Sequence, residues 1–210
     1  MTVFHFIGSL SVLEIIIWQS IRTGVKIEER NTYKEKRAHW RLSKLFKKGA
    51  LGMGYVEELR KVVGHSPLIL VGAVVVLVDP DGRLLLEERK FPEGLWGLPG
   101  GLMELGESTE DTAKREVLEE TGLTVSELRL INVYSGPNHF VVAKNGDEYY
   151  VVTTAYYSDV YSGELTVDHE ESLSFKFFSP ERLPAKLVGS HCTVIKEFLE
   201  LQCSAEVSSK

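Results

Sequence analysis

The sequence predicts an α/β sandwich with a mixed β-sheet, in which one helix follows the third strand and another closes the chain. Two observations carry this prediction. Residues 68–78 form a long, almost continuously apolar run that is rich in β-branched side chains, as expected for a strand buried on both faces. Residues 101–123 contain a short helix between two capping signals, and three strand-like segments follow. Helices and strands in this order are typical of a layered α/β domain.

Composition and charge favour one globular domain preceded by a different kind of segment. The 210 residues are 43% hydrophobic and 26% charged, which is enough apolar material for a sizeable core. The net charge of −6 is uneven, because residues 1–48 carry +6 and the remaining residues carry −12. We therefore predict an N-terminal extension over residues 1–52 and one globular domain over residues 53–210. An acidic domain does not favour extended nucleic acid and suits small ligands better.

The N-terminal extension leaves three interpretations open. Its apolar stretch, residues 3–18, is interrupted by His5 and Glu14 and has no basic residue before it, so we do not expect a secretory signal. The basic stretch 22–48 could lie on an anionic membrane surface, or it could be poorly ordered. Alternatively, the codons that encode residues 47–50 could hold a ribosome-binding sequence, and the natural start would then be Met53. Membrane contact is expected only if residues 1–48 are native.

The other elements follow in order after Met53. A short amphipathic helix, Val56–Val63, ends at Gly64. The turn signal Asp79–Gly82 leads into a second strand, which we expect to pair back on the first. The two cysteines lack metal-ligand spacing, which indicates free thiols and a cytoplasmic location. The remaining predicted elements are strands at Leu84–Glu88, Leu128–Ser135, Tyr149–Tyr157 and Leu173–Phe178, a turn at Asn145–Asp147 and a closing helix at Cys192–Leu201.

The helix within residues 101–123 is bounded by local signals. Ser108 is suited to the N-cap, with Asp111 three residues later as in a capping box. Acidic residues in the first turn also complement the positive end of the helix dipole. Gly122 is suited to the left-handed residue that ends a helix. These signals predict about three turns beginning near Thr109.

Three carboxylates share one face of this helix. Glu116, Glu119 and Glu120 stand at i, i+3 and i+4, beside an apolar face made by Ala113 and Val117. Like charges on one face repel, and a divalent cation would resolve the repulsion. Carboxylate oxygens suit Mg²⁺, with Mn²⁺ as a second choice. The alternative is a solvated acidic face held by pairs four residues apart.

The whole segment resembles the Nudix box of the Nudix hydrolases. That signature has a glycine, a glutamate after five residues and Arg-Glu after seven more, and then an aliphatic residue, Glu-Glu, Gly and an aliphatic residue at fixed gaps. The resemblance implies a Nudix-type α/β/α sandwich with a mixed β-sheet, over roughly residues 66–202, with the catalytic helix following a glycine-rich loop. Residues 55–67 also resemble the leader of some small bacterial Nudix proteins. The defined positions are filled by Gly101, Glu107, Arg115, Glu116, Val117, Glu119, Glu120, Gly122 and Leu123.

The resemblance implies metal-assisted hydrolysis of the diphosphate linkage in a nucleoside diphosphate joined to a group X. Glu116, Glu119 and Glu120 would hold the cation, and the carbonyl of Gly100 would complete its ligands, although the turn Trp96–Gly101 also reads as an ordinary tight turn. Arg115 would organise the glutamates. Glu107 would bind a further metal or hydrogen-bond the loop.

The general base and the substrate contacts stay open. The base is either Glu116 or a glutamate of a late loop, Glu170 or Glu171. Arg89, with Lys90, is a candidate for phosphate contact, and a solvated strand end is its alternative. Phe140, His139 or Tyr134 is a candidate for stacking on a base, and packing is the alternative for each.

The sequence does not identify the substrate. Pro137 lies one residue short of the position of a proline that marks many ADP-ribose hydrolases, and Phe140 stands near the position of a tyrosine that marks many dinucleoside polyphosphate hydrolases. The markers of NADH and coenzyme A hydrolases are absent. We expect a small nucleotide as partner, no extended nucleic acid, and a possible homodimer. The rival hypothesis is a catalytically silent Nudix domain that senses a nucleotide.

Overall fold

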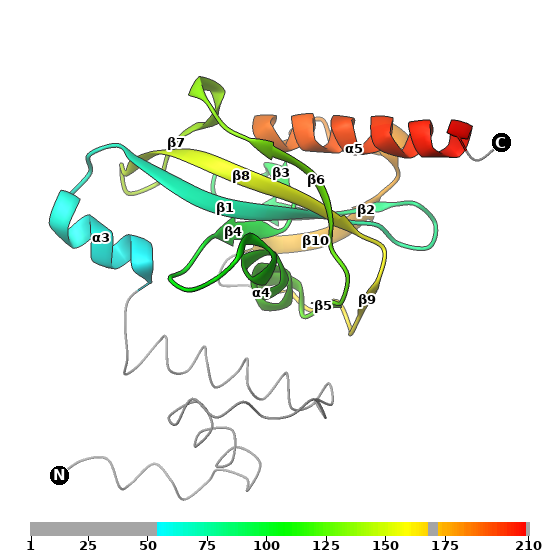
Figure 1. Cartoon of the computed structure of the whole chain (residues 1–210), viewed down its shortest axis with the longest axis horizontal. Coiled ribbons are helices and arrows are strands. Elements are labelled where there is room, and N and C mark those ends of the chain that lie inside the picture. The colour runs from blue at the N-terminus through cyan, green and yellow to red at the C-terminus, as the bar shows by residue number, and fades with distance from the viewer. Residues whose placement is uncertain (1–53, 168–171, 209–210) are drawn as a thin grey trace, which may run out of the picture. The chain divides into compact units, whose positions relative to one another are not determined.

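The computed structural model describes residues 54–167 and 172–208 (Figure 1). The predicted extension over residues 1–52, the boundary at Met53 and the candidate bases Glu170 and Glu171 lie outside these ranges. Two larger β-sheets and two long helices carry the described fold, with a small two-stranded sheet beside them and a third helix before the first strand.

The first sheet is mixed, as predicted. Strand β1 (Leu68–Leu77) runs parallel to β8 (Glu148–Ser158) along all its residues and antiparallel to β4 (Gly100–Leu102). On the other side of β8 lie β6 (Arg129–Tyr134) and β7 (Phe140–Val142), both antiparallel to it. Because β1 has a neighbour on each side and a helix layer on each face, its last eight residues are almost all buried, which explains the continuous apolar run.

The second sheet corrects one prediction about pairing. Strand β2 (Leu84–Arg89) pairs with β10 (Ser172–Phe178) and with β3 (Trp96–Gly97), and it meets β1 only at a bridge between Val78 and Leu84. The tight turn at Asp79–Gly82 is present, with a hydrogen bond from the Gly82 amide to the Asp79 carbonyl. The expected hairpin does not continue, because β4 and β8 already occupy the two sides of β1.

Two helices cover opposite faces of the sheets (Figure 1). Helix α4 (Thr109–Thr121) packs Ala113 and Val117 against Ala73, Val75 and Leu77 of β1. Helix α5 (Gly189–Ser208) packs against the intervening side chains of β1. Adjacent residues of a strand point to opposite faces, so α4 and α5 lie on opposite sides of β1. The α5 core is formed by Val74, Val76, Leu84, Leu86, Leu98, Tyr134, Ala155, Val194, Ile195 and Phe198.

Helix α3 (Tyr55–Val63) is confirmed, and it differs from the other two helices. It ends at Gly64, whose φ is 63° and whose amide donates to the Arg60 carbonyl. None of its residues is buried. Its apolar side chains are at most partly buried, and polar contacts at both of its ends also attach it to the domain, as described below.

The shortest elements were not expected from the sequence. The glycine-rich segment Trp96–Gly101, predicted as a turn, holds β3 and the start of β4, and the chain passes there from the second sheet to the first. Strand β5 (Thr124–Val125) pairs with β9 (Tyr161–Ser162). The predicted turn at Asn145–Asp147 joins β7 to β8. Two 3₁₀ turns, Pro137–His139 and Pro180–Arg182, complete the elements.

Two further observations concern the lengths of the helices and the state of the cysteines. None of the helices within residues 54–167 and 172–208 is long and apolar enough to cross a membrane. Both cysteines are exposed on α5 as free thiols, as predicted.

Candidate active site

Local contacts fix both ends of α4, as the capping signals predicted. The Ser108 hydroxyl accepts from the Asp111 amide at 3.1 Å, and the Asp111 carboxylate accepts from the Ser108 amide at 3.1 Å. At the other end Gly122 has φ 73° and donates its amide to the Leu118 carbonyl. An added Cβ at Gly122 would overlap the Thr166 hydroxyl, so glycine is needed there for two reasons. The carboxylates on α4 therefore stand on a helix with defined ends.

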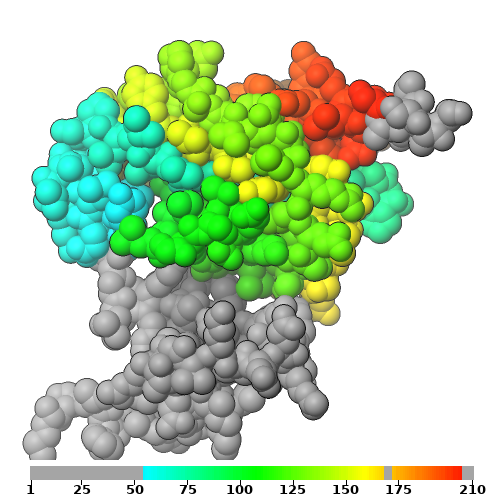
Figure 2. All heavy atoms as spheres, viewed as in Figure 1, coloured from blue at the N-terminus to red at the C-terminus, as the bar shows by residue number. Residues whose placement is uncertain are grey.

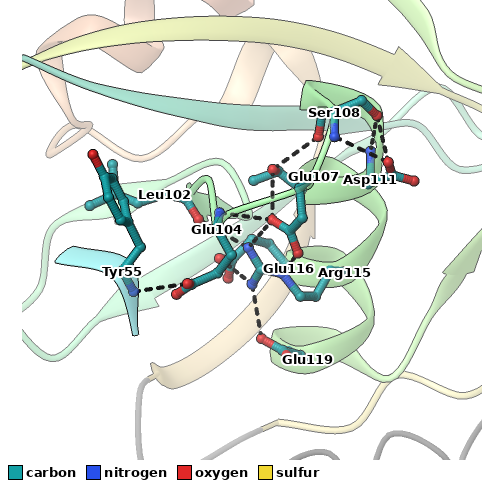
Figure 3. Close-up of polar contacts among 10 residues, drawn as sticks. Tyr55, Leu102, Glu104, Glu107, Ser108, Asp111, Arg115, Glu116 and Glu119 are labelled. Atoms are coloured by element: carbon teal, nitrogen blue, oxygen red, sulfur yellow. Dashed lines mark hydrogen bonds and ion pairs between the residues drawn. The ribbon is translucent and has the colours of Figure 1, made fainter. Parts of the chain in front are cut away.

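Arg115 is the centre of the polar contacts in Figure 3. Its Nε and Nη2 donate to the two oxygens of Glu107, at 2.5 and 3.0 Å. Its Nη1 donates to Glu116 at 2.6 Å and to Glu119 at 3.1 Å, and Nη2 also donates to the Leu102 carbonyl at 3.0 Å. These five bonds match the five N–H groups of a guanidinium. The N–H groups of Arg115 therefore donate to protein groups on and around α4.

Glu107 anchors the loop between β4 and α4. Burial is the largest single influence and opposes its ionisation, but the hydrogen bonds from Arg115, Glu104 and Thr112 and the charge of Arg115 together outweigh it and lower the pKa of Glu107 to about 2. The Glu104 amide and the Thr112 hydroxyl also donate to Glu107, each at 3.0 Å. Of the two predicted roles for Glu107, the hydrogen bond to the loop is present in the structure.

Glu120 is a buried carboxylate among other carboxylates. Its side chain accepts from the Gly100 amide at 3.0 Å, and the residue is only 7% exposed. Burial raises the pKa of Glu120 well above its ordinary value, and the negative charges of Glu87 and Glu116 raise it further. Such a group is costly unless a positive charge joins it.

Glycines bring the loop close to these carboxylates. An added Cβ at Gly101 would lie 2.5 Å from the carboxylate carbon of Glu116. Gly100 has φ 147°, and a Cβ there would overlap the Ala73 carbonyl of β1. Glu116 therefore lies directly against the loop backbone only because residue 101 has no side chain.

Glu87 is a site residue that the sequence reasoning missed. It lies on β2, is 5% exposed, and accepts from the Ser172 hydroxyl at 2.8 Å. Arg89, the candidate for phosphate contact, places its Nε 3.4 Å from Glu87. The sequence signal that could have found Glu87 is the alternation of side chains along a strand, because Glu87 shares a face of β2 with the buried Leu85.

The donor set fits a divalent cation. Within residues 54–167 and 172–208, no group of three or more His, Cys, Asp or Glu side chains already converges as metal ligands. The reason is that Arg115 holds Glu116 and Glu119. Even so, the buried Glu120 lies close enough to Glu87 and Glu116 for their charges to act on it, and carboxylate oxygens gathered in this way are the donors that suit Mg²⁺ or Mn²⁺. The ligand roles of Gly100, Glu116, Glu119 and Glu120 stay predictions.

The structure shows local contacts or exposure for the other predicted substrate residues. Phe140 is half-exposed on β7, and its ring centroid lies 5.0 Å from that of Tyr150. Tyr134 is buried and donates its hydroxyl to Glu197 of α5 at 2.7 Å, so it packs in the core. His139 lies beside Tyr134, with ring centroids 6.4 Å apart. Lys90 is exposed at the end of β2.

Comparisons with known proteins agree on one family. The NUDIX domain profile matches residues 69–198. The chain is 35% identical over 127 residues to "Putative 8-oxo-dGTP diphosphatase" of Bacillus subtilis (strain 168), covering 60% of this chain and 78% of that protein. It is 31% identical over 162 residues to the ADP-ribose pyrophosphatase of Methanocaldococcus jannaschii, covering 74% and 91%. The crystal structure of a MutT NUDIX hydrolase from Burkholderia pseudomallei superposes with a TM-score of 0.53 at 29% identity, covering 61% of this chain and 97% of that one.

Proposed function

This chain belongs to the NUDIX domain family and is a Nudix pyrophosphohydrolase, and from that premise we propose that it uses a divalent cation to hydrolyse the diphosphate linkage of a small nucleotide. The family resemblance stated from the sequence is therefore confirmed, as is the α/β fold. The cation, the class of nucleotide and the residue roles are the proposal.

One observation carries the proposal. Glu120 is buried beside Glu87 and Glu116, at the point where Gly100 and Gly101 bring the loop backbone close to α4. Stability alone does not explain a buried carboxylate among like charges. A site for a cation and a phosphate does explain it.

The side chains divide into ligands and supports. Glu116, Glu119 and Glu120 would hold Mg²⁺ or Mn²⁺, with the Gly100 carbonyl as a further ligand. A cation there supplies positive charge against the phosphates and makes water a better nucleophile. Arg115 and Glu107 hold the carboxylates and the loop in place through their own hydrogen bonds. Arg115 directs its N–H groups to the protein, so phosphate binding falls to other residues, of which Arg89 is one candidate.

The general base stays one of the two predicted alternatives. Glu116 lies on α4 at the cluster, and Glu170 and Glu171 directly precede β10 in the sequence. Ser172, the next described residue, is fully buried and donates to Glu87.

The relatives suggest the class of substrate. One is named for a modified deoxynucleoside triphosphate and the other for ADP-ribose, and each is a nucleoside diphosphate joined to a further group. We propose the same general class for this chain. An acidic domain also favours a small nucleotide over extended nucleic acid.

A substrate panel tests the proposal. Purified full-length protein is incubated with nucleoside triphosphates (including 8-oxo-dGTP), ADP-ribose, dinucleoside polyphosphates, sugar nucleotides and capped RNA, each with Mg²⁺, with Mn²⁺ or with EDTA. We expect cation-dependent release of a nucleoside monophosphate from at least one compound. This activity should be lost in Glu119→Gln. Nucleotide binding without turnover, unchanged in Glu119→Gln, would instead support the silent sensor.

A further inference from the structure

We propose that helix α3 positions the loop between β4 and α4, residues 103–108, which we call the catalytic loop. Glu104 is the residue that transmits the position of α3 to Glu107 and Arg115. This inference rests on the proposed function, because it assigns α3 to the same site. The two residues that receive a new role, Tyr55 and Glu104, lie outside α4. The basis of the inference is a continuous chain of hydrogen bonds from the start of α3 to the carboxylates of α4 (Figure 3).

The first link joins α3 to the loop between β4 and α4. The backbone amide of Tyr55 donates to the Glu104 carboxylate at 2.9 Å. Tyr55 is the first residue of α3, so its amide is one of those that a helix leaves without an internal partner. A carboxylate at that end is also favoured by the helix dipole. Glu104 thus caps α3 from a distant part of the chain.

The second link joins Glu104 to the acidic helix. The Glu104 amide donates to Glu107 at 3.0 Å, and Glu107 accepts from Arg115. Arg115 in turn donates to Glu116 and Glu119. Only two residues, Glu104 and Glu107, therefore separate α3 from Arg115, which holds the two carboxylates.

The other end of α3 is fastened to the turn between β7 and β8. Arg60 donates to the carbonyls of Gly64 and Ser66, at 3.0 and 2.7 Å, and to that of Glu148 at 2.9 Å. Asp147 lies 3.4 Å from the Arg60 Nε and hydrogen-bonds the ring of His65 at 2.7 Å. Helix α3 therefore spans the distance between the β7–β8 turn and the catalytic loop. In Figure 2 its cyan atoms lie against green atoms of the region that contains this loop.

The attachment of α3 combines polar contacts at its two ends with a partly buried apolar face made by Val56, Leu59 and Val63. No residue of α3 is buried, and Val62 is 84% exposed. A helix of nine residues is marginal in water without outside contacts. Contacts outside the helix therefore stabilise α3, and the hydrogen bond from Tyr55 to Glu104 is the one that joins it to the loop between β4 and α4.

A pair of substitutions at one position isolates the Tyr55 amide. Tyr55→Pro removes the N–H, and proline is well tolerated at the first position of a helix. Tyr55→Ala removes the same side chain and keeps the N–H. Glu104→Ala removes the acceptor, while Glu104→Gln keeps an acceptor oxygen in the same place. Glu58→Ala, on the exposed side of α3 where Glu58 forms an ion pair with Lys61, is the matched acidic control.

The first readout is amide hydrogen exchange of residues 102–108, which requires neither cation nor substrate. We expect faster exchange in Tyr55→Pro and Glu104→Ala than in Tyr55→Ala, Glu104→Gln and Glu58→Ala. Equal exchange in all five variants would overturn the positioning role, whatever the fate of the proposed function.

The second readout is Mn²⁺ affinity by electron paramagnetic resonance, without substrate. We expect Tyr55→Pro and Glu104→Ala to weaken Mn²⁺ binding about three- to tenfold, and the double variant to be no weaker than the weaker single variant. Full additivity, or affinities equal to those of the controls, would contradict the coupling. A wild-type protein that neither binds Mn²⁺ nor hydrolyses any nucleotide would instead count against the proposed function, and hydrogen exchange would still decide the role of α3.

Discussion

At the scale of single residues, the site holds a buried charge that the fold alone does not require. Glu120 is almost fully buried, and its partner in the described structure is the Gly100 amide. Burial and the charges of Glu87 and Glu116 both favour its protonated form. Function and stability therefore make opposite demands on this position.

Because function and stability make opposite demands on Glu120, they predict the effects of Glu120→Gln. This substitution keeps the shape of the side chain and an acceptor oxygen for the Gly100 amide. Without cation, the variant should melt at the same temperature as the wild type or higher, because one of three like charges is gone. The rise in melting temperature on adding Mn²⁺ should disappear, and hydrolysis should fall about 100-fold or more. Differential scanning fluorimetry with and without Mn²⁺ measures the first two effects. A destabilised variant with intact Mn²⁺ response would show that Glu120 is purely structural.

His191 is a second buried titratable residue, and it supports the loop from α5. Its Nδ1 accepts from the Leu98 amide at 2.9 Å, and the residue is 7% exposed. Burial, with a smaller effect of Arg89, lowers the pKa of His191 to about 3 from an ordinary value of 6.5. Gly97 allows the approach, since an added Cβ there would lie 3.0 Å from Nδ1. The neutral ring is therefore part of the folded state.

The pKa of His191 predicts a pH dependence of stability. The unfolded chain binds a proton at this residue below about pH 6.5, whereas the folded chain does so only near pH 3. This contribution is complete above pH 6.5 and is lost as the pH falls toward 3, by roughly 3–5 kcal/mol in all. His191→Asn, which keeps an acceptor and does not titrate, should lose less stability than the wild type between pH 7.5 and pH 4.5. Urea unfolding at several pH values measures the difference, and parallel curves for the two proteins would refute it.

At the scale of elements, two neighbouring glutamates of β2 form a natural comparison. Glu87 accepts from Ser172 on the buried side, and Glu88 accepts from Ser174 at 2.7 Å. Both bonds join β2 to β10, but only Glu87 is buried and acts on the charge of Glu120. The two pairs thus separate the link between strands from the effect on the site.

This comparison predicts different outcomes for two conservative substitutions. Glu87→Gln should weaken Mn²⁺ binding and hydrolysis about 10- to 100-fold, because it removes a negative charge beside Glu120. Glu88→Gln should leave both within about twofold of the wild type. Isothermal titration calorimetry with Mn²⁺ gives the affinities. Equal effects of the two substitutions would mean that Glu87 serves only to join the strands.

The sequence predicted those elements whose signals are local. Helix α4 begins and ends where Ser108 and Gly122 indicated, because caps act within a few residues. Strands of two residues, such as β3 and β5, are too short to leave a periodic pattern, and β5 also depends on a partner far along the chain, β9. The same reason explains the error over β2 and the omission of Glu87. Which sheet a strand joins, and what its polar residue faces, depends on the strands already paired.

At the scale of the whole molecule, the site draws on both sheets and both long helices. Gly100 lies in the first sheet, Glu87 in the second, Glu120 on α4, and His191 of α5 holds the loop at Leu98. The chain crosses between the sheets at Leu98 and Pro99, directly before the loop. No layer of the described fold can separate without moving a group of the site.

This arrangement predicts that heating abolishes hydrolysis and the fold together. Residual activity and far-ultraviolet circular dichroism, followed against temperature in the presence of Mg²⁺, should give midpoints within about 2 °C of each other, as expected of one cooperative transition. Inactivation well below the structural transition would show that the site opens locally before the sheets part.

The contacts of α3 also bear on where this domain may be cut. The residues that match the family end at 69 and 198, whereas Tyr55, Arg60 and the last ten described residues of α5 lie beyond them. A protein trimmed to the matched residues would keep every carboxylate of the signature and lose the helix whose first turn Glu104 caps. The functional boundary of the domain is therefore set by a hydrogen bond at Tyr55, about one helix earlier than sequence similarity would place it.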